Sequence, residues 1–542
     1  MASITESQYQ TFITMAKREY LWLAKTHTSK DGNFLEHTLA SLSLIELVED
    51  LGWVALGELR QLAKQQPREF DRRMTTLMFS LFNLSNLNLH QNTSNANQRF
   101  FQPLKMNNYY PVSQENNMVD MVSFEQEFEL AVKQKRLASL ITRMLPPYDQ
   151  VTRLRHAIKH YQGFLYHPWP KVELDFSPKL GQRHPKIKLI RELLQRHGDL
   201  PRHSFDQKQK HLSAYRQSIL DTHLINGIKR FQSRHGLKIN GHLDEETLIV
   251  LNTPVKKIVA RLQKNLSRWF LLPKQLPDHY IFVNIPQFKL WVFEEGEERL
   301  EMKVIVGKQA RPTPFMISKI NSITLNPSWT PTRNIIQSDL WPEYLHNYIS
   351  LHDRGFQLIA NSPGSNIKVG LNKPNLPLLQ LLKDYRLVQQ PGQYNALGRY
   401  RFNLINNQSI FLHDTPVKSL FNKPYRALSH GCVRLEDADL LARYLLNKSR
   451  VQREQMHYIW QTGASQNINK NDKSKFETSA LNSKQTQTLA LNNSIPTFLA
   501  YYTVWVDEQG VLHQLPDVYG FDGLAQTSAT ESANTTLAFS QP

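Results

Sequence analysis

Apolar residues recur at helical spacing through roughly the first 165 residues of the chain. One such series is Leu35, Leu39, Leu42 and Ile45. A second run of this kind spans residues 128–145. Side chains three and four positions apart share one face of an α-helix. We therefore predict a helical domain over residues 1–165, which carries no catalytic signature and which we interpret as a scaffold.

Residues 166–255 predict a second, smaller helical domain. Its expected helices span residues 187–198, 224–237 and 243–252. The second helix ends at His235-Gly236, a pair suited to a left-handed helix end, and Asn240-Gly241 marks a turn before the third. The alternative interpretation is a generic helical linker domain.

The pattern changes from helical to alternating near Pro277. Leu300, Met302, Val304 and Val306 lie two residues apart, as on one face of a strand. With a turn at Glu295-Gly296, residues 279–307 predict a β-hairpin. Further strand-like runs cover residues 322–329, 398–405 and 409–415.

These runs predict a β-rich domain over residues 256–460. A stretch with helical and loop texture, at about residues 330–394, interrupts it. A long insertion in a β domain is typical of a lid over a site. After it we expect a polar linker at 461–493, a strand segment at 494–521 and a disordered tail at 522–542. The fold class is therefore α+β and multidomain.

Composition narrows the partners and the setting. The chain has 542 residues, with 65 Lys and Arg against 47 Asp and Glu, a net charge of +18. A basic surface attracts polyanions, but no nucleic-acid-binding motif is present, so nucleic acid is not expected. No uncharged apolar run approaches the ~20 residues of a transmembrane helix, so we expect no transmembrane segment. The first thirty residues show no secretory signal pattern.

The stretch from residue 410 to residue 446 carries the candidate chemistry. It holds His413 after a strand-like run, then Ser429-His430-Gly431-Cys432, and an amphipathic pattern that predicts a helix over residues 436–446. A cysteine just before a helix N-terminus has a lowered thiol pKa. Cys432, the single cysteine, is therefore the candidate nucleophile. The N–H groups around Gly431 and Cys432 are candidates for an oxyanion hole.

A cysteine nucleophile needs a base. His430 lies two residues from Cys432, which disfavours a direct contact between the ring and the thiol. His413 comes from a separate strand, so we assign it the base role, with His430 helping the oxyanion or the loop. The carbonyl or the side chain of Asp414 would orient the His413 ring.

Other interpretations of these residues remain open. His413, His430, Cys432 and Asp414 have the atoms of a zinc site but not its usual spacing, and a metal would block the nucleophile. Papain-like enzymes place their cysteine before the histidine in the chain, the reverse of this order. Arg434 either binds a substrate carboxylate or orients the loop. The candidates for lining the pocket are Trp329, Tyr400 and Arg399, although aromatic residues in strands are more often core.

His413, a fifteen-residue spacer and Ser-His-Gly-Cys before a hydrophobic residue resemble the signature of L,D-transpeptidases with a YkuD-type catalytic domain. Further pieces resemble the large periplasmic subgroup of that family: VNIPQFKLWVF, VIVGKQARPTP, LNPSW, NALGRYRF and LHDTP. The three-helix segment resembles a peptidoglycan-binding-like domain. The resemblance covers about residues 185–450. Arg434 stands where some members have Asn, and Asp414 where Ser is frequent.

The resemblance implies a cysteine acyltransferase that forms 3-3 cross-links in peptidoglycan. The donor would be a tetrapeptide stem bound as a thioester to Cys432, and neither metal nor cofactor would be needed. The same acyl-enzyme would serve an L,D-carboxypeptidase or a transpeptidase that anchors wall proteins. A non-catalytic peptidoglycan-binding scaffold is the rival from another class. The implied location is the periplasm or cell envelope, with stem peptides and other cell-wall enzymes as partners.

Overall fold

The computed structural model describes residues 6–16, 20–26, 34–37, 39–54, 56–85, 114–174, 178–201, 216–362, 367–371, 377–446 and 486–523. The chain forms two compact units. The first combines the chain up to Leu276 with the residues from Tyr502 onward, and the second runs from Pro277 to Tyr501. Most of the expected linker and the tail beyond residue 523 lie outside the described residues.

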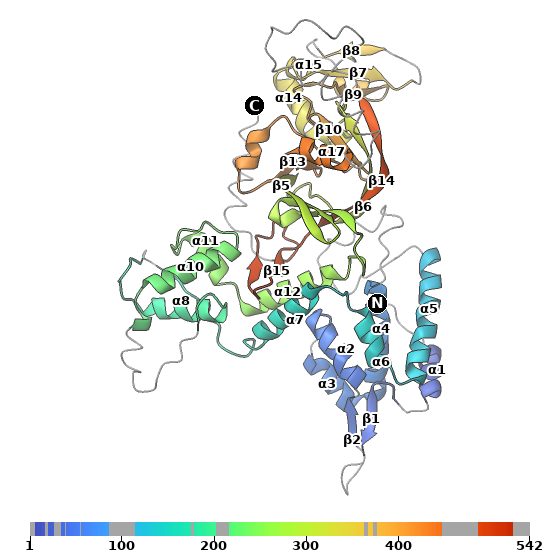
Figure 1. Cartoon of the computed structure of the whole chain (residues 1–542), viewed down its shortest axis with the longest axis vertical. Coiled ribbons are helices and arrows are strands. Elements are labelled where there is room, and N and C mark those ends of the chain that lie inside the picture. Colours follow the sequence, from blue (N-terminus) through green and yellow to red (C-terminus); the bar gives the residue numbers. More distant parts are fainter. Residues whose placement is uncertain are drawn as a thin grey trace. The chain divides into compact units, whose positions relative to one another are not determined.

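The N-terminal part of the first unit is mainly helical, as predicted (Figure 1). Its helices are α1 Glu6–Ala16, α2 Leu39–Asp50, α3 Leu56–Gln65, α4 Pro67–Ser85, α5 Gln114–Lys133, α6 Leu137–Met144 and α7 Asp149–Gln162. One expectation was wrong. Leu35 belongs to the strand β2 (Phe34–His37), which pairs antiparallel with β1 (Leu23–Thr26), so its spacing to Leu39 only mimics a helical repeat.

Three helices follow where the sequence predicts them. They are α8 Pro185–Arg196, α10 Thr222–Arg234 and α11 Glu245–Leu251, and they share a hydrophobic core of their own. The buried Gln232 joins the turn to the last helix. Its amide donates to Asn240 Oδ1 at 2.9 Å and Thr247 Oγ1 at 3.1 Å, and its Oε1 accepts from Gly241 N–H at 2.8 Å. Gly236, at φ +65°, ends α10 in the predicted left-handed conformation.

The helix α12 (Val255–Trp269) belongs to the first unit, although the sequence placed residues from 256 onward in the β-rich domain. The reason lies far along the chain, close to its C-terminal end. Residues 502–523 return to the first unit and form the strand pair β15 (Val504–Val506) and β16 (Leu512–Gln514). These residues pack on α12, so α12 belongs to the same unit as this C-terminal segment.

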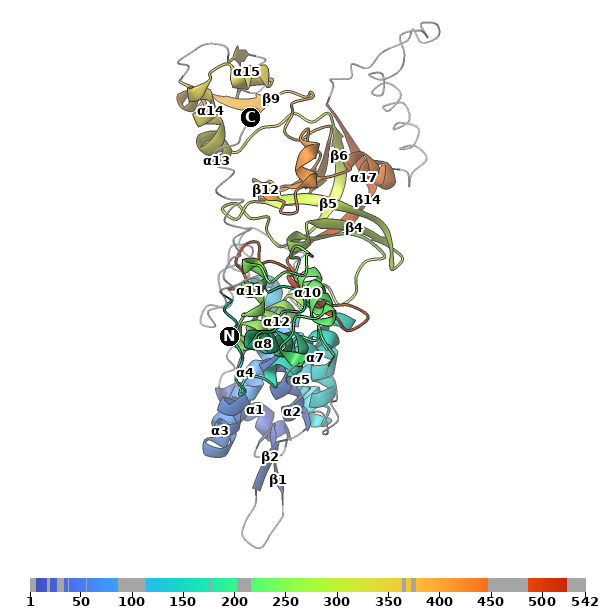
Figure 2. The same cartoon turned by 90° about the vertical axis from the view of Figure 1, so that its left-hand side faces the viewer.

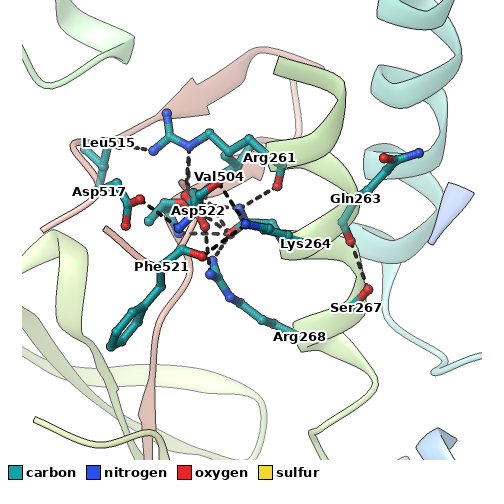
Figure 3. Close-up of polar contacts among 12 residues, drawn as sticks. Arg261, Gln263, Lys264, Ser267, Arg268, Val504, Leu515, Asp517, Phe521 and Asp522 are labelled. Carbon is teal, nitrogen blue, oxygen red and sulfur yellow. Dashed lines mark hydrogen bonds and ion pairs between the residues drawn. The ribbon is translucent and has the colours of Figure 1, made fainter. Parts of the chain in front are cut away.

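A buried carboxylate fixes this C-terminal segment (Figure 3). Asp522, fully buried, bonds Arg261 Nε at 2.9 Å and Arg268 Nη2 at 2.7 Å, both on α12. Its backbone N–H donates to Asp517 at 2.7 Å, and Thr503 donates its hydroxyl to the carboxylate. The expectation that residue 522 begins a disordered tail is therefore wrong. Asp522 is held by ion pairs with two arginines of α12, and the local composition of the sequence does not reveal these long-range contacts.

The second unit is built on a nine-stranded sheet of order β12-β5-β13-β11-β10-β6-β14-β3-β4, in which β5 also pairs with β4. Its strands are β3 His279–Asn284, β4 Lys289–Glu294, β5 Glu297–Gly307, β6 Met316–Leu325, β10 Tyr400–Leu404, β11 Leu412–His413, β12 Ala427–Ser429, β13 Val433–Leu435 and β14 Gln487–Ala500. The extra pairing closes the sheet from β5 to β4 on itself, and β12 pairs with β5 alone.

The structure changes the extent of two predicted elements, the β-hairpin at residues 279–307 and the strand segment at residues 494–521. β4 and β5 form a hairpin around Glu295-Gly296, and β3 adds a third antiparallel strand through a turn at Phe288. β14 begins at Gln487, inside the expected linker, because it pairs with both β6 and β3. Long-range pairing extends the strand into a polar stretch of sequence.

The expected insertion forms a small body with its own hydrophobic core (Figure 2). It contains α13 Arg333–Ile335, a π-helical turn Ile336–Leu340, α14 Trp341–His346, α15 Ser350–Asp353, α16 Leu378–Leu381 and the sheet of β7 Phe356–Ala360, β8 Lys368–Gly370 and β9 Tyr385–Gln389. The fold as a whole is thus a multidomain α+β fold, as predicted. None of the helices described is long and apolar enough to cross a membrane.

Substitution of Asp522 tests the role of the C-terminal segment. Burial alone would raise the pKa of Asp522, but the charges of Arg268 and Arg261 hold it below the usual value. D522A removes the carboxylate that two largely buried arginines share and should lower the free energy of unfolding of the first unit by ~3–5 kcal/mol. The stabilisation should be present above about pH 4 and disappear as the pH falls further.

Urea unfolding followed by circular dichroism measures this effect. Asp149 provides the matched control, because its carboxylate is 89% exposed and lies 3.6 Å from Arg153. D149A should change the free energy of unfolding by no more than ~1 kcal/mol. Equal effects of the two substitutions would contradict the proposed importance of the buried pair.

Candidate active site

The parallel pairing of β11 with β13 brings the predicted site residues together. Leu412 pairs with Val433, and His413 pairs with Arg434. Paired residues of neighbouring strands point to the same face of a sheet. His413 therefore lies beside Arg434, and Cys432 precedes β13 by one residue.

Cys432 does not precede a helix directly, contrary to the sequence-based expectation. β13 separates it from α17 (Ala438–Leu446), whose first residue lies six positions after Cys432. The charged pattern at residues 436 and 437 marks the turn before the helix rather than the nucleophile. The helix dipole therefore acts too far from the thiol to lower its pKa, since the effect fades within one turn.

Backbone and hydroxyl groups hold the loop of residues 429–432, which carries the candidate nucleophile Cys432 and is called the nucleophile loop below. Ser429 Oγ accepts from Gly431 N–H at 3.1 Å and donates to the Cys432 carbonyl at 2.6 Å. Thr313 Oγ1 donates to the Gly431 carbonyl at 2.7 Å and accepts from Gly307 N–H at 2.8 Å. The Gly431 N–H is thus engaged, which corrects its expected role as an oxyanion donor. The N–H of Cys432 is the remaining candidate.

Two glycines permit this close packing of loops. Gly431 has φ +116°, a conformation that L-residues with side chains rarely adopt. A Cβ at Gly307 would lie 2.1 Å from the Arg311 carbonyl oxygen and 3.0 Å from Gly431 Cα. The strand end at residue 307 and the nucleophile loop can approach one another only without side chains at these positions.

His413 is buried and held by a backbone carbonyl. Its Nδ1 lies 2.5 Å from the carbonyl oxygen of Asp414. Because a carbonyl only accepts, Nδ1 carries the proton, and Nε2 presents a lone pair. Burial, together with the charge of Arg434, lowers the pKa of His413 to about 3. The ring is therefore neutral at physiological pH.

The side chain of Asp414 serves the neighbouring turn instead. Its Oδ2 accepts from the Arg399 N–H at 2.9 Å, and its Oδ1 binds Lys418 Nζ at 2.7 Å. The sequence left open whether the carbonyl or the carboxylate of Asp414 faces His413. The hydrogen bond to Nδ1 involves the carbonyl.

The thiol of Cys432 is partly exposed and poorly hydrated. Its Sγ lies 3.6 Å from the Ser409 carbonyl oxygen. Burial raises the pKa of the Cys432 thiol, although a hydrogen bond from Phe411 and the charge of Arg434 act in the opposite direction. The expectation of a lowered thiol pKa was therefore wrong for the resting protein.

Two arginines flank His413 in one row across the sheet. Arg401 of β10 pairs with His413, which in turn pairs with Arg434 of β13. Burial lowers the pKa of both guanidinium groups. Arg434 Nε is buried and has no hydrogen-bond partner in the described part of the chain. Neither arginine forms an ion pair with a described carboxylate, so the row has an uncompensated positive charge.

His430 contacts a residue that the sequence did not indicate. Its Nε2 lies 2.9 Å from Oδ2 of Asp339, in the insertion, and the same oxygen lies 3.0 Å from Arg311 Nη1. The sequence places Asp339 91 positions before His430, with no motif around it. Only the fold of the insertion reveals this contact.

The expected pocket-lining residues have other contacts. Tyr400 is 4% exposed and donates its hydroxyl to Asp439 of α17, so it belongs to the core. Trp329 bridges to Gln389 and packs edge-on against Phe356, at the base of the insertion. Arg399 is exposed and contributes its N–H to Asp414. Burial excludes an open lining role for Tyr400.

The zinc interpretation receives no geometric support from these contacts. Within the described ranges, no group of three or more His, Cys, Asp or Glu side chains could hold a metal ion. The carboxylate of Asp414 binds Lys418, and His430 Nε2 faces Asp339, so two of the supposed ligands are directed elsewhere.

Comparison with known proteins identifies the class of domain. Residues 278–452 match YkuD, the L,D-transpeptidase catalytic domain. A Haemophilus influenzae protein named "Putative L,D-transpeptidase" is 33% identical over 290 residues, 52% of this chain and 53% of that protein. The chain thus matches about half the length of this curated relative.

Solved structures with weaker similarity include two L,D-transpeptidases. The Mycobacterium smegmatis protein is 16% identical with a TM-score of 0.18, over 31% of this chain and 53% of that chain. The Stackebrandtia nassauensis protein is 16% identical with a TM-score of 0.19, over 51% and 90%. From the family match and the curated relative, the chain contains a YkuD-type L,D-transpeptidase catalytic domain at residues 278–452. The resemblance of this region to a YkuD-type catalytic domain is confirmed.

The ionisation of the thiol can be tested by alkylation. Iodoacetamide reacts with the thiolate that is already formed. The alkylation rate of wild-type protein should therefore reach half its maximum at a pH above ~8.5, the pKa of a free thiol. R434Q should move the midpoint higher, because the charge of Arg434 stabilises the thiolate. Cys432 is the single cysteine, so labelling reports this site alone. A midpoint below that of glutathione, measured in parallel, would contradict a raised thiol pKa.

Proposed function

We propose that the protein is an L,D-transpeptidase that forms 3-3 cross-links in peptidoglycan through a thioester on Cys432. The observation that carries the proposal is the β11–β13 pairing. It sets His413, whose Nε2 is unprotonated, beside the nucleophile loop of a YkuD domain. A nucleophile, a base from another strand and an acceptor that orients the base are the parts that acyl transfer requires.

The proposed first half-reaction transfers the donor stem to the enzyme. His413 Nε2 takes the thiol proton as Cys432 Sγ attacks the carbonyl of the third stem residue. The Cys432 N–H stabilises the resulting oxyanion. The C–N bond to the terminal D-Ala then breaks, and His413 returns the proton to the departing amine. A thioester and free D-Ala result.

The second half-reaction restores the thiol. An amine on the third residue of another stem attacks the thioester and gives a proton to His413. The C–S bond breaks, and the sulfur recovers a proton from His413. Both groups begin and end neutral, which agrees with a low pKa for the imidazole and a raised pKa for the thiol. A dry site disfavours a standing ion pair between them.

The positive row around His413 supports an anionic donor. Stem tetrapeptides carry carboxylates close to the scissile bond. A carboxylate at Arg434 would satisfy its buried Nε and offset the charges of Arg434 and Arg401. We therefore assign substrate binding, rather than loop orientation alone, to Arg434.

The remaining parts of the proposal follow from the catalytic domain. A peptidoglycan substrate places the protein in the periplasm or cell envelope, where other cell-wall enzymes are candidate partners. We propose that α8, α10 and α11 bind peptidoglycan, because their fold and turn residues match the expected three-helix domain. A carbapenem, which acylates thiolates of such sites, is the expected covalent inhibitor.

Loss of the nucleophile tests the reaction directly. C432A should abolish cross-linking of purified disaccharide-tetrapeptides while leaving the thermal unfolding temperature nearly unchanged, since the thiol contributes little packing. Mass spectrometry of the products measures this. Cross-linked dimers from wild-type protein support transpeptidation, whereas tripeptides alone would indicate an L,D-carboxypeptidase. Wild-type protein that gives neither product, and gains no carbapenem adduct on Cys432, would contradict the proposal.

The two histidines should differ in pH dependence. Wild-type acylation by a carbapenem should change little between about pH 5 and 8, because neutral His413 accepts the proton throughout. H413Q should lose ~10²–10⁴ in rate, and its rate should rise about tenfold per pH unit toward the raised pKa of the thiol. H430Q should be acylated more slowly than wild-type protein, but its acylation rate should depend on pH in the same way. The reverse pattern would make His430 the base.

A further inference from the structure

An aspartate of the insertion lies against the nucleophile loop. The carboxylate of Asp339 is 18% exposed, and the His430 ring that it meets is 25% exposed. At an N–O distance of 2.9 Å between two partly buried side chains, this contact is stronger than an exposed one. It is also distant in sequence, so it depends on how the insertion folds.

A π-helical turn presents Asp339. The turn spans Ile336–Leu340, and its end residues are 3% and 4% exposed in the core of the insertion. These two anchors fix the turn, while Asp339 between them contacts His430. π-helical turns are rare and are concentrated at functional sites, because they displace a side chain from the regular helical path.

Arg311 links the same carboxylate to a second segment beside the nucleophile. Its guanidinium contacts Asp339 at 3.0 Å and also the hydroxyl of Ser338. The loop that carries Arg311 also carries Thr313, which donates to the Gly431 carbonyl. Asp339 is therefore joined to both chain segments that surround Cys432.

The contact determines which nitrogen of His430 carries the proton. Burial lowers the pKa of His430, and the charge of Asp339 opposes this only in part. The positive charges that face the ring, on Lys308, Arg311 and Arg434, lower it further. The ring is thus neutral at neutral pH. Since a carboxylate only accepts, the proton lies on Nε2, and Nδ1 is left as an acceptor.

We propose that Asp339 is a positioning residue for His430. It fixes the Nε2–H form and the orientation of the ring, and it couples the insertion to the nucleophile loop. Asp339 touches neither the thiol nor His413 and acts through His430. The inference rests on the proposed function, because its effect is read in the acylation of Cys432.

A double-mutant cycle tests this role in the full-length chain. The variants are D339A, H430Q and the double mutant D339A/H430Q, and the measurement is the rate at which meropenem acylates Cys432, followed by intact mass. D339A should slow acylation ~10- to 100-fold, the range for losing one hydrogen bond to a charged group. The double mutant should be no slower than H430Q, because Asp339 acts through that ring.

A matched control separates positioning from general damage to the insertion. Glu343 of α14 binds Arg354 through both carboxylate oxygens, at 2.7 and 2.8 Å, within the same insertion. E343Q should leave the acylation rate unchanged. D339N keeps the volume of the side chain and serves if D339A fails to fold. It should also slow acylation in the wild-type background and not in H430Q.

Each outcome decides one question. A wild-type rate in D339A or in D339N, losses that multiply with those of H430Q, or a loss in E343Q as large as in D339A would overturn the inference. Those results would leave the proposed function intact, since wild-type protein would still be acylated. If wild-type protein is not acylated and forms no cross-links, the proposed function itself fails.

Discussion

The candidate site depends on a ladder of two residue pairs between β11 and β13. Strands this short have no stability of their own. They are held because β10 and β5 flank them in the sheet and because the side chains of Leu412 and Val433 are completely buried. The relative position of the histidine and the nucleophile loop is therefore a property of the whole closed sheet. A change in its register would turn His413 to the other face.

The close approach of backbones around Cys432 creates an unusual electrostatic environment. Gly307 and Gly431 admit no side chains, so the chain segments around Cys432 pack closely, and burial and the charge of Arg434 act on both His413 and Cys432. Under these conditions an imidazole resists protonation and a thiol resists ionisation. At rest, the imidazole of His413 and the thiol of Cys432 are consequently both neutral, and in the mechanism we propose proton transfer and bond formation occur together.

In each of the two units, one carboxylate makes similar contacts with basic residues that are distant from it in the sequence. Asp522 returns from the C-terminal side to two arginines of α12, and Asp339 reaches from the insertion to His430 and Arg311. In each case one carboxylate binds two basic groups that are distant in sequence. The first contact is fully buried and stabilises a unit, whereas the second is partly exposed and lies next to the chemistry.

The sequence by itself determined the features that arise from local patterns. Apolar spacing located α8, α10 and α11, alternation located β4 and β5, and Ser-His-Gly-Cys after His413 identified the family, because short-range spacing decides which side chains share a face or a loop. Only the tertiary structure decided the raised pKa of Cys432, the engaged N–H of Gly431, the core position of Tyr400 and the contacts of Asp339 and Asp522. These depend on burial and on partners many residues away, and local composition encodes neither.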